Sequence, residues 1–229
     1  MCDPTLFRPD STLAELATQW AGASRVFQRH ELDYCCQGKR TLAEACRDRR
    51  LPVEELLDEL RRETTTPPPD GNWSERPPAQ LIVHIVDHYH AGHRTELPRL
   101  LAMAEKVERV HGGKPDCPAG LAEHLHTMAD ALERHMQKEE RILFPMLLAG
   151  AELSAWAPIQ CLTAEHDEHG RDLARMRVLA HGFQAPPGAC GTWRALYLGL
   201  SEFERSVMEH IHLENHVLFP RALRVAEPS

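Results

Sequence analysis

Two segments of the chain share one pattern of histidine, glutamate and apolar residues. The pattern HxxxExxxLFP starts at His135 and again at His210. On an α-helix, residues four positions apart lie on the same face, so each segment offers an imidazole and a carboxylate to one point. A single pair of this kind is usually an exposed ion pair on a helix surface. Its repetition, with the same Leu-Phe-Pro ending, instead predicts a metal site.

A histidine-bearing segment precedes each copy of this pattern. The sequence HxxHxxxL starts at His90 and at His166, and the surrounding apolar residues place both histidines of each pair on the inward face. We favour His90 and His166 as metal ligands. His93 and His169, one turn further along, are interpreted as residues that support the ligands or line a pocket beside them.

The other histidines have no such pattern. His30 lies in the N-terminal part without ligand spacing around it. The remaining ones are expected on the surface or flanks of helices: His84, His88, His111, His124, His126, His181, His212 and His216.

The predicted ligand set therefore contains four histidines and two glutamates. These are His90, His135, Glu139, His166, His210 and Glu214. Zinc usually takes four tetrahedral ligands, so six nitrogen and oxygen donors fit two five- or six-coordinate ions better. We expect two iron ions per chain, with manganese as the second choice, bridged by Glu139 and Glu214. Two carboxylates leave an oxidised pair with excess positive charge, which favours an added oxo or hydroxo bridge.

Four long helical patterns can position these ligands. They cover residues 79–110, 118–148, 155–182 and 191–224, and short connections separate them. Short connections make successive helices antiparallel neighbours, so the sequence predicts an all-α protein with an up-down-up-down four-helix bundle.

A smaller helical region precedes the bundle. Thr12 with Glu15 and Thr41 with Glu44 match the capping box, and a further helix is expected at residues 54–63 after Pro52. Residues 64–78 are too rich in proline to be helical and indicate a linker. The predicted domains are thus residues 1–63, the linker 64–78, and the bundle 79–229.

Two of the seven cysteines, Cys35 and Cys36, are adjacent. Consecutive Cα atoms lie about 3.8 Å apart, below the roughly 4.4 Å that relaxed disulfides need. A bond between these cysteines would be strained, which favours a redox or iron-handling role. The alternative is a pair of ordinary thiols in a turn before the helix that starts after Thr41.

Composition excludes several classes of protein. The 229 residues carry a formal net charge of −8 and have a pI near 6.0, which argues against nucleic-acid binding. Apolar runs are too short to span a membrane, and residues 1–10 lack the features of a signal peptide. We expect a soluble cytoplasmic protein, and the sequence allows a homodimer.

Longer motifs extend beyond the ligands. They are DYCCxG at 33–38, KVERVHxxKP at 106–115, HxxKEExxLFPM at 135–146, EHDExG at 165–170 and HxxLENxxLFPRAL at 210–223. With these motifs the bundle resembles hemerythrin-like domains, and nearly the whole chain resembles the iron-sulfur cluster repair di-iron proteins (the YtfE/ScdA/RIC family). The first 63 residues resemble the ScdA N-terminal domain. Gln37 departs from the family pattern, in which a second glycine is common.

The resemblance implies the same six ligands and a cytoplasmic protein that restores iron-sulfur clusters damaged by nitric oxide or peroxide. Damaged iron-sulfur proteins and nitric oxide would be its partners. Iron donation, NO binding and NO reduction to N₂O all remain open. The main alternative is a non-catalytic carrier or sensor of NO or O₂, and the DYCC segment favours repair over it.

Overall fold

The computed structural model describes residues 7–63 and 72–225. Within these ranges the regular structure is helical, apart from an isolated antiparallel bridge between Thr12 and Thr41. The prediction of an all-α protein is confirmed. The described residues form two compact units, one from Ile82 to Val207 and the other from the residues on either side of it.

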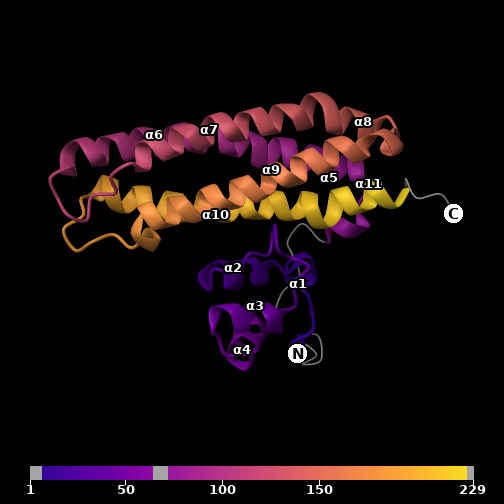
Figure 1. Cartoon of the computed structure of the whole chain (residues 1–229), viewed down its shortest axis with the longest axis horizontal. Helices are drawn as coiled ribbons and strands as arrows, with labels where there is room; N and C mark the ends of the chain where they lie inside the picture. Colours follow the sequence, from indigo (N-terminus) through magenta and orange to yellow (C-terminus); the bar gives the residue numbers. More distant parts are fainter. Residues whose placement is uncertain (1–6, 64–71, 226–229) are drawn as a thin grey trace. The chain divides into compact units, whose positions relative to one another are not determined.

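The unit from Ile82 to Val207 contains long helices joined by short loops. They are α6 (Ala91–His111), α7 (Leu121–Lys138), α9 (Glu152–Leu179) and α10 (Gly191–Leu213), which continues past this unit. Helix α7 lies against α6 and α9 (Figure 1). The loop between α6 and α7 and the short α8 (Phe144–Leu148) reverse the chain, so the predicted up-down-up-down order of the helices is confirmed.

Apolar side chains on the facing sides of these helices form the core of this unit. Leu100 on α6, Leu125 on α7 and Leu196 on α10 are fully buried. Gly199 allows α10 to approach α6 closely, because a Cβ atom at this position would lie 2.7 Å from Leu100 Cδ2. Burial of these side chains is the main stabilising contribution to the bundle.

The long helices are less regular than the sequence predicts. The first begins with α5 (Pro78–His84), continues through a π-helical turn, η3 (Ile85–His90), and then becomes α6. Similar turns, η4 (Glu139–Leu143) and η6 (Glu214–Leu218), lead into α8 and α11 (Phe219–Val225). The third predicted helix ends three residues early, since His181, Gly182 and Phe183 have positive φ angles and form the 3₁₀ turn η5 (His181–Phe183).

The other unit contains the short helices α1 (Leu13–Gln19), α2 (Ala21–Arg29), α3 (Leu42–Arg49) and α4 (Val53–Glu63) (Figure 1). The sequence predicts α1, α3 and α4, whereas α2 was not predicted. Both predicted capping boxes are confirmed, with Thr12 and Thr41 each exchanging hydrogen bonds with the glutamate three residues later. Within the predicted linker, Trp73–Glu75 form a 3₁₀ turn, η2, while 64–71 lie outside the described residues.

The C-terminal segment belongs to this same unit. Turn η6 contacts α1 and η2, and Met208 packs against the apolar cluster of the N-terminal helices. Ser24 Oγ donates a hydrogen bond to Glu209 Oε1 at 3.0 Å, and Arg221 donates to the carbonyl of Arg76 at 2.6 Å. The second HxxxE segment is thus packed against the N-terminal helices.

Candidate metal centre

Four of the predicted ligands converge within the unit from Ile82 to Val207. Glu139 Oε1 lies 3.1 Å from His135 Nε2 and 4.0 Å from His166 Nε2, and Glu139 Oε2 lies 3.3 Å from His90 Nε2. The Nε2 atoms of His135 and His166 are 3.0 Å apart. All four side chains are at most 1% exposed. Three helices therefore direct three imidazoles at one buried carboxylate.

Carboxylates outside this cluster orient two of the imidazoles. Glu140 Oε1 lies 2.7 Å from His90 Nδ1 and also accepts a hydrogen bond from Arg94. Glu165 Oε2 lies 3.0 Å from His135 Nδ1, and its other oxygen pairs with Lys138. When Nδ1 carries the proton and donates it to a carboxylate, the Nε2 lone pair faces Glu139, as in carboxylate-histidine-metal arrangements.

The pKa values of these outer carboxylates suit that role. The hydrogen bond from His135 lowers the pKa of Glu165 to about 2, with Lys138 adding to the effect against the opposing effect of burial. Burial would raise the pKa of Glu140, but hydrogen bonds from Arg94 and His90 outweigh it and lower the pKa. Both groups are therefore ionised acceptors at neutral pH.

The second HxxxE pair has the same local geometry in the other unit. His210 Nε2 lies 3.3 Å from Glu214 Oε1, and both side chains are 0% exposed. Leu143 and Leu218, four residues after the two glutamates, are also buried, as the shared pattern predicts.

Each of the two glutamates is the first residue of a π-helical turn. The N–H of Phe144 donates to the carbonyl of Glu139, and that of Phe219 donates to the carbonyl of Glu214, five residues back. Pro145 and Pro220 follow directly, and proline has no N–H to donate to the carbonyl four residues earlier. The Leu-Phe-Pro ending thus gives a physical reason for the wider turn, a feature often found at functional sites.

His169 lies beside the cluster around Glu139. Its ring centroid is 4.8 Å from that of His135, and among the described residues its buried Nε2 has no hydrogen-bond partner. Burial, followed by the nearby His135 and His166, lowers its pKa to about 3, so it is neutral at pH 7. His93 is also buried and packs edge-on against the ring of Phe203.

Two histidines expected on the surface or flanks are buried, so that prediction was wrong for them. His124 Nε2 lies 2.8 Å from the carbonyl of Asp172. His212 Nε2 lies 3.0 Å from Thr18 Oγ1, and burial lowers its pKa to about 3. The surface prediction holds for His88, His126 and His181, which are exposed, whereas His84, His111 and His216 are half-buried.

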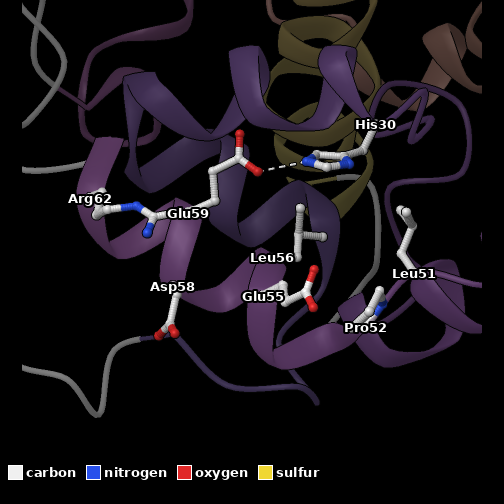
Figure 2. Close-up of a pocket in the computed structure, with 8 residues that line it drawn as sticks. All are labelled: His30, Leu51, Pro52, Glu55, Leu56, Asp58, Glu59 and Arg62. Atoms are coloured by element: carbon white, nitrogen blue, oxygen red, sulfur yellow. Dashed lines mark hydrogen bonds and ion pairs between the residues drawn. The ribbon is translucent and has the colours of Figure 1, made fainter.

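His30, which directly follows α2, lines a pocket of about 280 Å³ together with Leu51, Pro52 and side chains of α4 (Figure 2). Its Nε2 atom is 2.6 Å from Glu59 Oε2, and Arg29 binds the other oxygen of this carboxylate. Burial would raise the pKa of Glu59, but hydrogen bonds from His30 and Arg29 outweigh it and lower the pKa. This local pairing accounts for His30 without a metal.

The donor set around Glu139 fits a cation with nitrogen and oxygen ligands. A fully buried carboxylate surrounded by imidazoles is costly unless positive charge balances it. The Nε2 atoms of His135 and His166 face each other, so a proton or a metal ion must lie between their lone pairs. Imidazole and carboxylate donors together suit iron, manganese or zinc.

The cysteine pair lies in the unit that contains the second HxxxE segment. Cys35 and Cys36 have their Sγ atoms 3.6 Å apart, so they are not bonded to each other. The carbonyl of Cys35 accepts hydrogen bonds from Asn215 and His216, the two residues after Glu214.

Among the described residues, no helix combines the length and hydrophobicity needed to cross a lipid bilayer.

Comparisons with known proteins cover nearly the whole chain. The model described as "Hemerythrin HHE cation binding domain" matches residues 81–222, and ScdA_N, a "Domain of Unknown function (DUF542)", matches residues 9–64. Proteins named iron-sulfur cluster repair protein YtfE are 48% identical in Pectobacterium carotovorum, 47% in Pectobacterium atrosepticum and 46% in Yersinia pseudotuberculosis. Each match covers 94% of this chain and 97% of the relative.

Proposed function

This chain belongs to the YtfE family of iron-sulfur cluster repair proteins, and from that premise we propose that it repairs clusters damaged by nitrosative or oxidative stress by means of a di-iron site. Nitric oxide is its proposed small ligand, damaged iron-sulfur proteins are its proposed partners, and the cytoplasm is its proposed location.

The proposed iron ligands come from both HxxxE segments. His90, His135, His166 and His210 would hold the two irons, and Glu139 and Glu214 would be the carboxylates that the irons share. A metal site of this kind requires buried ligands. The side chains of His90, His135, Glu139 and His166 are buried, and so are those of His210 and Glu214. The hemerythrin-type model spans residues 81–222 and includes both segments in one domain, which supports this combination.

The observation that carries the proposal is the repeated HxxxE geometry. In both copies an imidazole nitrogen lies 3.1–3.3 Å from the carboxylate four residues later, and in both the glutamate begins a π-helical turn. An exposed helical ion pair would explain neither the complete burial nor the matching turns. Two matched buried pairs with additional histidines favour a two-metal centre.

The side chains of this chain have defined tasks in the proposed site. Glu140 and Glu165 hold the Nδ1 protons of His90 and His135. If each glutamate spans both metals, each iron has about four protein donors, and an octahedral ion keeps about two positions open. Those positions would serve an oxo or hydroxo bridge in the oxidised form and a small exogenous ligand such as NO.

Repair can be tested on a dehydratase whose [4Fe–4S] cluster has been damaged with NO. Iron-loaded protein should restore the dehydratase activity under anaerobic, reducing conditions, whereas His135→Ala should not. His126→Ala is the matched control, since His126 is exposed on the same helix and should leave repair intact. Equal repair by all three proteins would contradict a role for the site.

The alternative, a carrier or sensor of NO or O₂, uses the same metals without catalysis. It is distinguished by adding NO to the reduced protein anaerobically and measuring N₂O in the headspace. Several N₂O molecules per chain would establish NO reduction. Stoichiometric NO binding without N₂O, together with failure of the repair assay, would favour the carrier.

A further inference from the structure

The turn that carries the cysteine pair brings three potential ligand atoms together. Cys35 Sγ lies 3.2 Å from Asp33 Oδ1 and 3.6 Å from Cys36 Sγ, and one ligand atom from each of the three residues lies within 4.8 Å of the others. Metal–sulfur bonds of about 2.3 Å and metal–oxygen bonds of about 2.1 Å give tetrahedral edges of about 3.8 Å between sulfurs and about 3.6 Å between sulfur and oxygen. The observed separations are close to those edges.

From this geometry we propose that Asp33, Cys35 and Cys36 form a second metal site, which binds one thiophilic divalent cation such as Fe²⁺ or Zn²⁺. The two sulfurs are much farther apart than the roughly 2.05 Å of a disulfide. Two thiolates and a carboxylate favour such a cation over Mg²⁺ or Ca²⁺, which prefer oxygen ligands.

Hydrogen bonds hold the turn in this conformation. Asp33 Oδ1 accepts a bond from the N–H of Cys36 at 2.8 Å. The carbonyl of Cys35 accepts bonds from Asn215 Nδ2 at 3.0 Å and His216 Nε2 at 2.9 Å. The ligand atoms therefore sit on a backbone that is fixed from two sides.

Gly38 closes the turn at a position where only glycine fits. A Cβ atom there would lie 2.4 Å from the carbonyl oxygen of Tyr34 and 2.5 Å from His216 Nε2. A side chain at this position would displace His216 from the Cys35 carbonyl. The close approach of the two segments thus depends on the sequence DYCCxG itself.

Binding would exchange protons for the cation. The hydrogen bond with Cys36, burial, and the charge of Asp33 all raise the pKa of Cys35, so in the metal-free protein it is a thiol. Each bound cation would form two metal–sulfur bonds and one metal–oxygen bond and would displace any proton held by the thiols, without oxidation or reduction.

The accessibility of the turn suggests an exchangeable ion. Cys35 is buried, but Cys36 is partly exposed, and three protein ligands leave a fourth tetrahedral position for water or for a ligand from another protein. Structural zinc sites usually have four protein ligands. That the physiological ion is iron in transit to a cluster rests on the proposed function, whereas cation binding itself does not.

Cobalt(II) is a suitable probe, because thiolate ligands give it a charge-transfer absorption in the near ultraviolet that imidazole and carboxylate ligands do not. The full-length reduced protein, titrated anaerobically with Co²⁺, should show this band with a stoichiometry of one thiolate-bound cobalt per chain. Cys36→Ser, the change at the more exposed ligand, should abolish or shift the band, and Asp33→Asn should weaken the binding that produces it at least about tenfold.

Two controls separate this site from the bundle and from other thiols. Cys161→Ser removes an exposed thiol elsewhere and should leave the band unchanged, as should His135→Ala. Loss of the band in His135→Ala would assign it to the bundle instead. Absence of the band in the native protein, or its persistence in Cys36→Ser, would overturn the proposal, whatever the outcome of the repair assay.

Discussion

The two HxxxExxxLFP segments have the same ligand geometry but use the next two residues differently. After Glu139, Glu140 holds the Nδ1 atom of His90 and pairs with Arg94. After Glu214, Asn215 and His216 instead hold the carbonyl of Cys35. The histidine, the glutamate and the π-helical turn are common to both copies, while the residues after them match their different surroundings.

This difference separates two kinds of constraint on the sequence. In the proposed site the histidine and the glutamate of each copy are metal ligands, so we expect the two copies to respond alike when these residues change. The residues after the glutamate are set by the segment that each copy contacts. Changes there should affect metal binding in the first copy and the cysteine turn in the second.

The largest effect is expected from removing either glutamate. Glu139→Ala and Glu214→Ala should each lose most of the bound iron, because a bridging carboxylate contributes to both metals. Iron should raise the melting temperature of the native protein but not that of the two variants, since a bound ligand stabilises only the folded state. Metal analysis and thermal unfolding with and without iron measure both effects. If either variant kept its full iron content, the copy of the motif that was changed would not contribute a ligand to the site.

Changes at the next position should distinguish the copies. Glu140→Gln weakens the orientation of His90, and loss of such outer partners typically lowers metal affinity about 10- to 100-fold. Asn215→Ala should leave the iron affinity of the di-iron site unchanged. Competition with a chelator measures the iron affinity of each variant. Equal affinities in the two variants would show that the residue after the glutamate has the same importance for iron binding in both copies.

Acid should affect the first copy through Glu165. Its pKa is about 2 in the folded protein, below the ordinary value of 4.5, so its stabilising contribution is complete above about pH 4.5 and is lost as the pH falls toward 2. In metal-free protein, Glu165→Gln should therefore flatten the dependence of unfolding free energy on pH in this window. An unchanged slope would mean that His135 and Lys138 do not stabilise the ionised form.

The smallest effect is expected at the cysteine turn. His216→Ala removes one hydrogen bond to the Cys35 carbonyl, a contribution of about 0.5–1.5 kcal/mol. Alkylation of Cys36 should accelerate a few-fold, which mass spectrometry of the labelled peptide can follow, while iron content stays constant. Loss of iron would instead show that His216 supports the metal centre directly.

The sequence predicts what depends on local periodicity. Thr12 and Thr41 have their glutamates at the spacing of a capping box, and the structure confirms both caps. The inward phase of His90 and His93 follows from nearby apolar residues, and both are buried. These features depend on neighbours within one or two helical turns.

Features that depend on contacts between distant segments were missed. Glu140 and Glu165 stand directly beside Glu139 and His166 in the motifs, but their role depends on the histidines of other helices. The sequence predicts a surface or flank position for His212, but in the structure Thr18 and Tyr34 contact its ring. Pro145 and Pro220 indicate the π-helical turns in the sequence, but the spacing of apolar residues, from which the helices were predicted, carries no information about them.

Mössbauer spectroscopy of the iron-57-loaded protein, combined with iron analysis, tests most directly whether both HxxxE copies contribute to one di-iron centre. The proposed bridging by Glu139 and Glu214 predicts about two irons per chain whose spins are coupled, and loss of this coupled signal in both His135→Ala and His210→Ala. The absence of any spin-coupled pair of irons, or a coupled pair that survives either substitution, would contradict a shared centre.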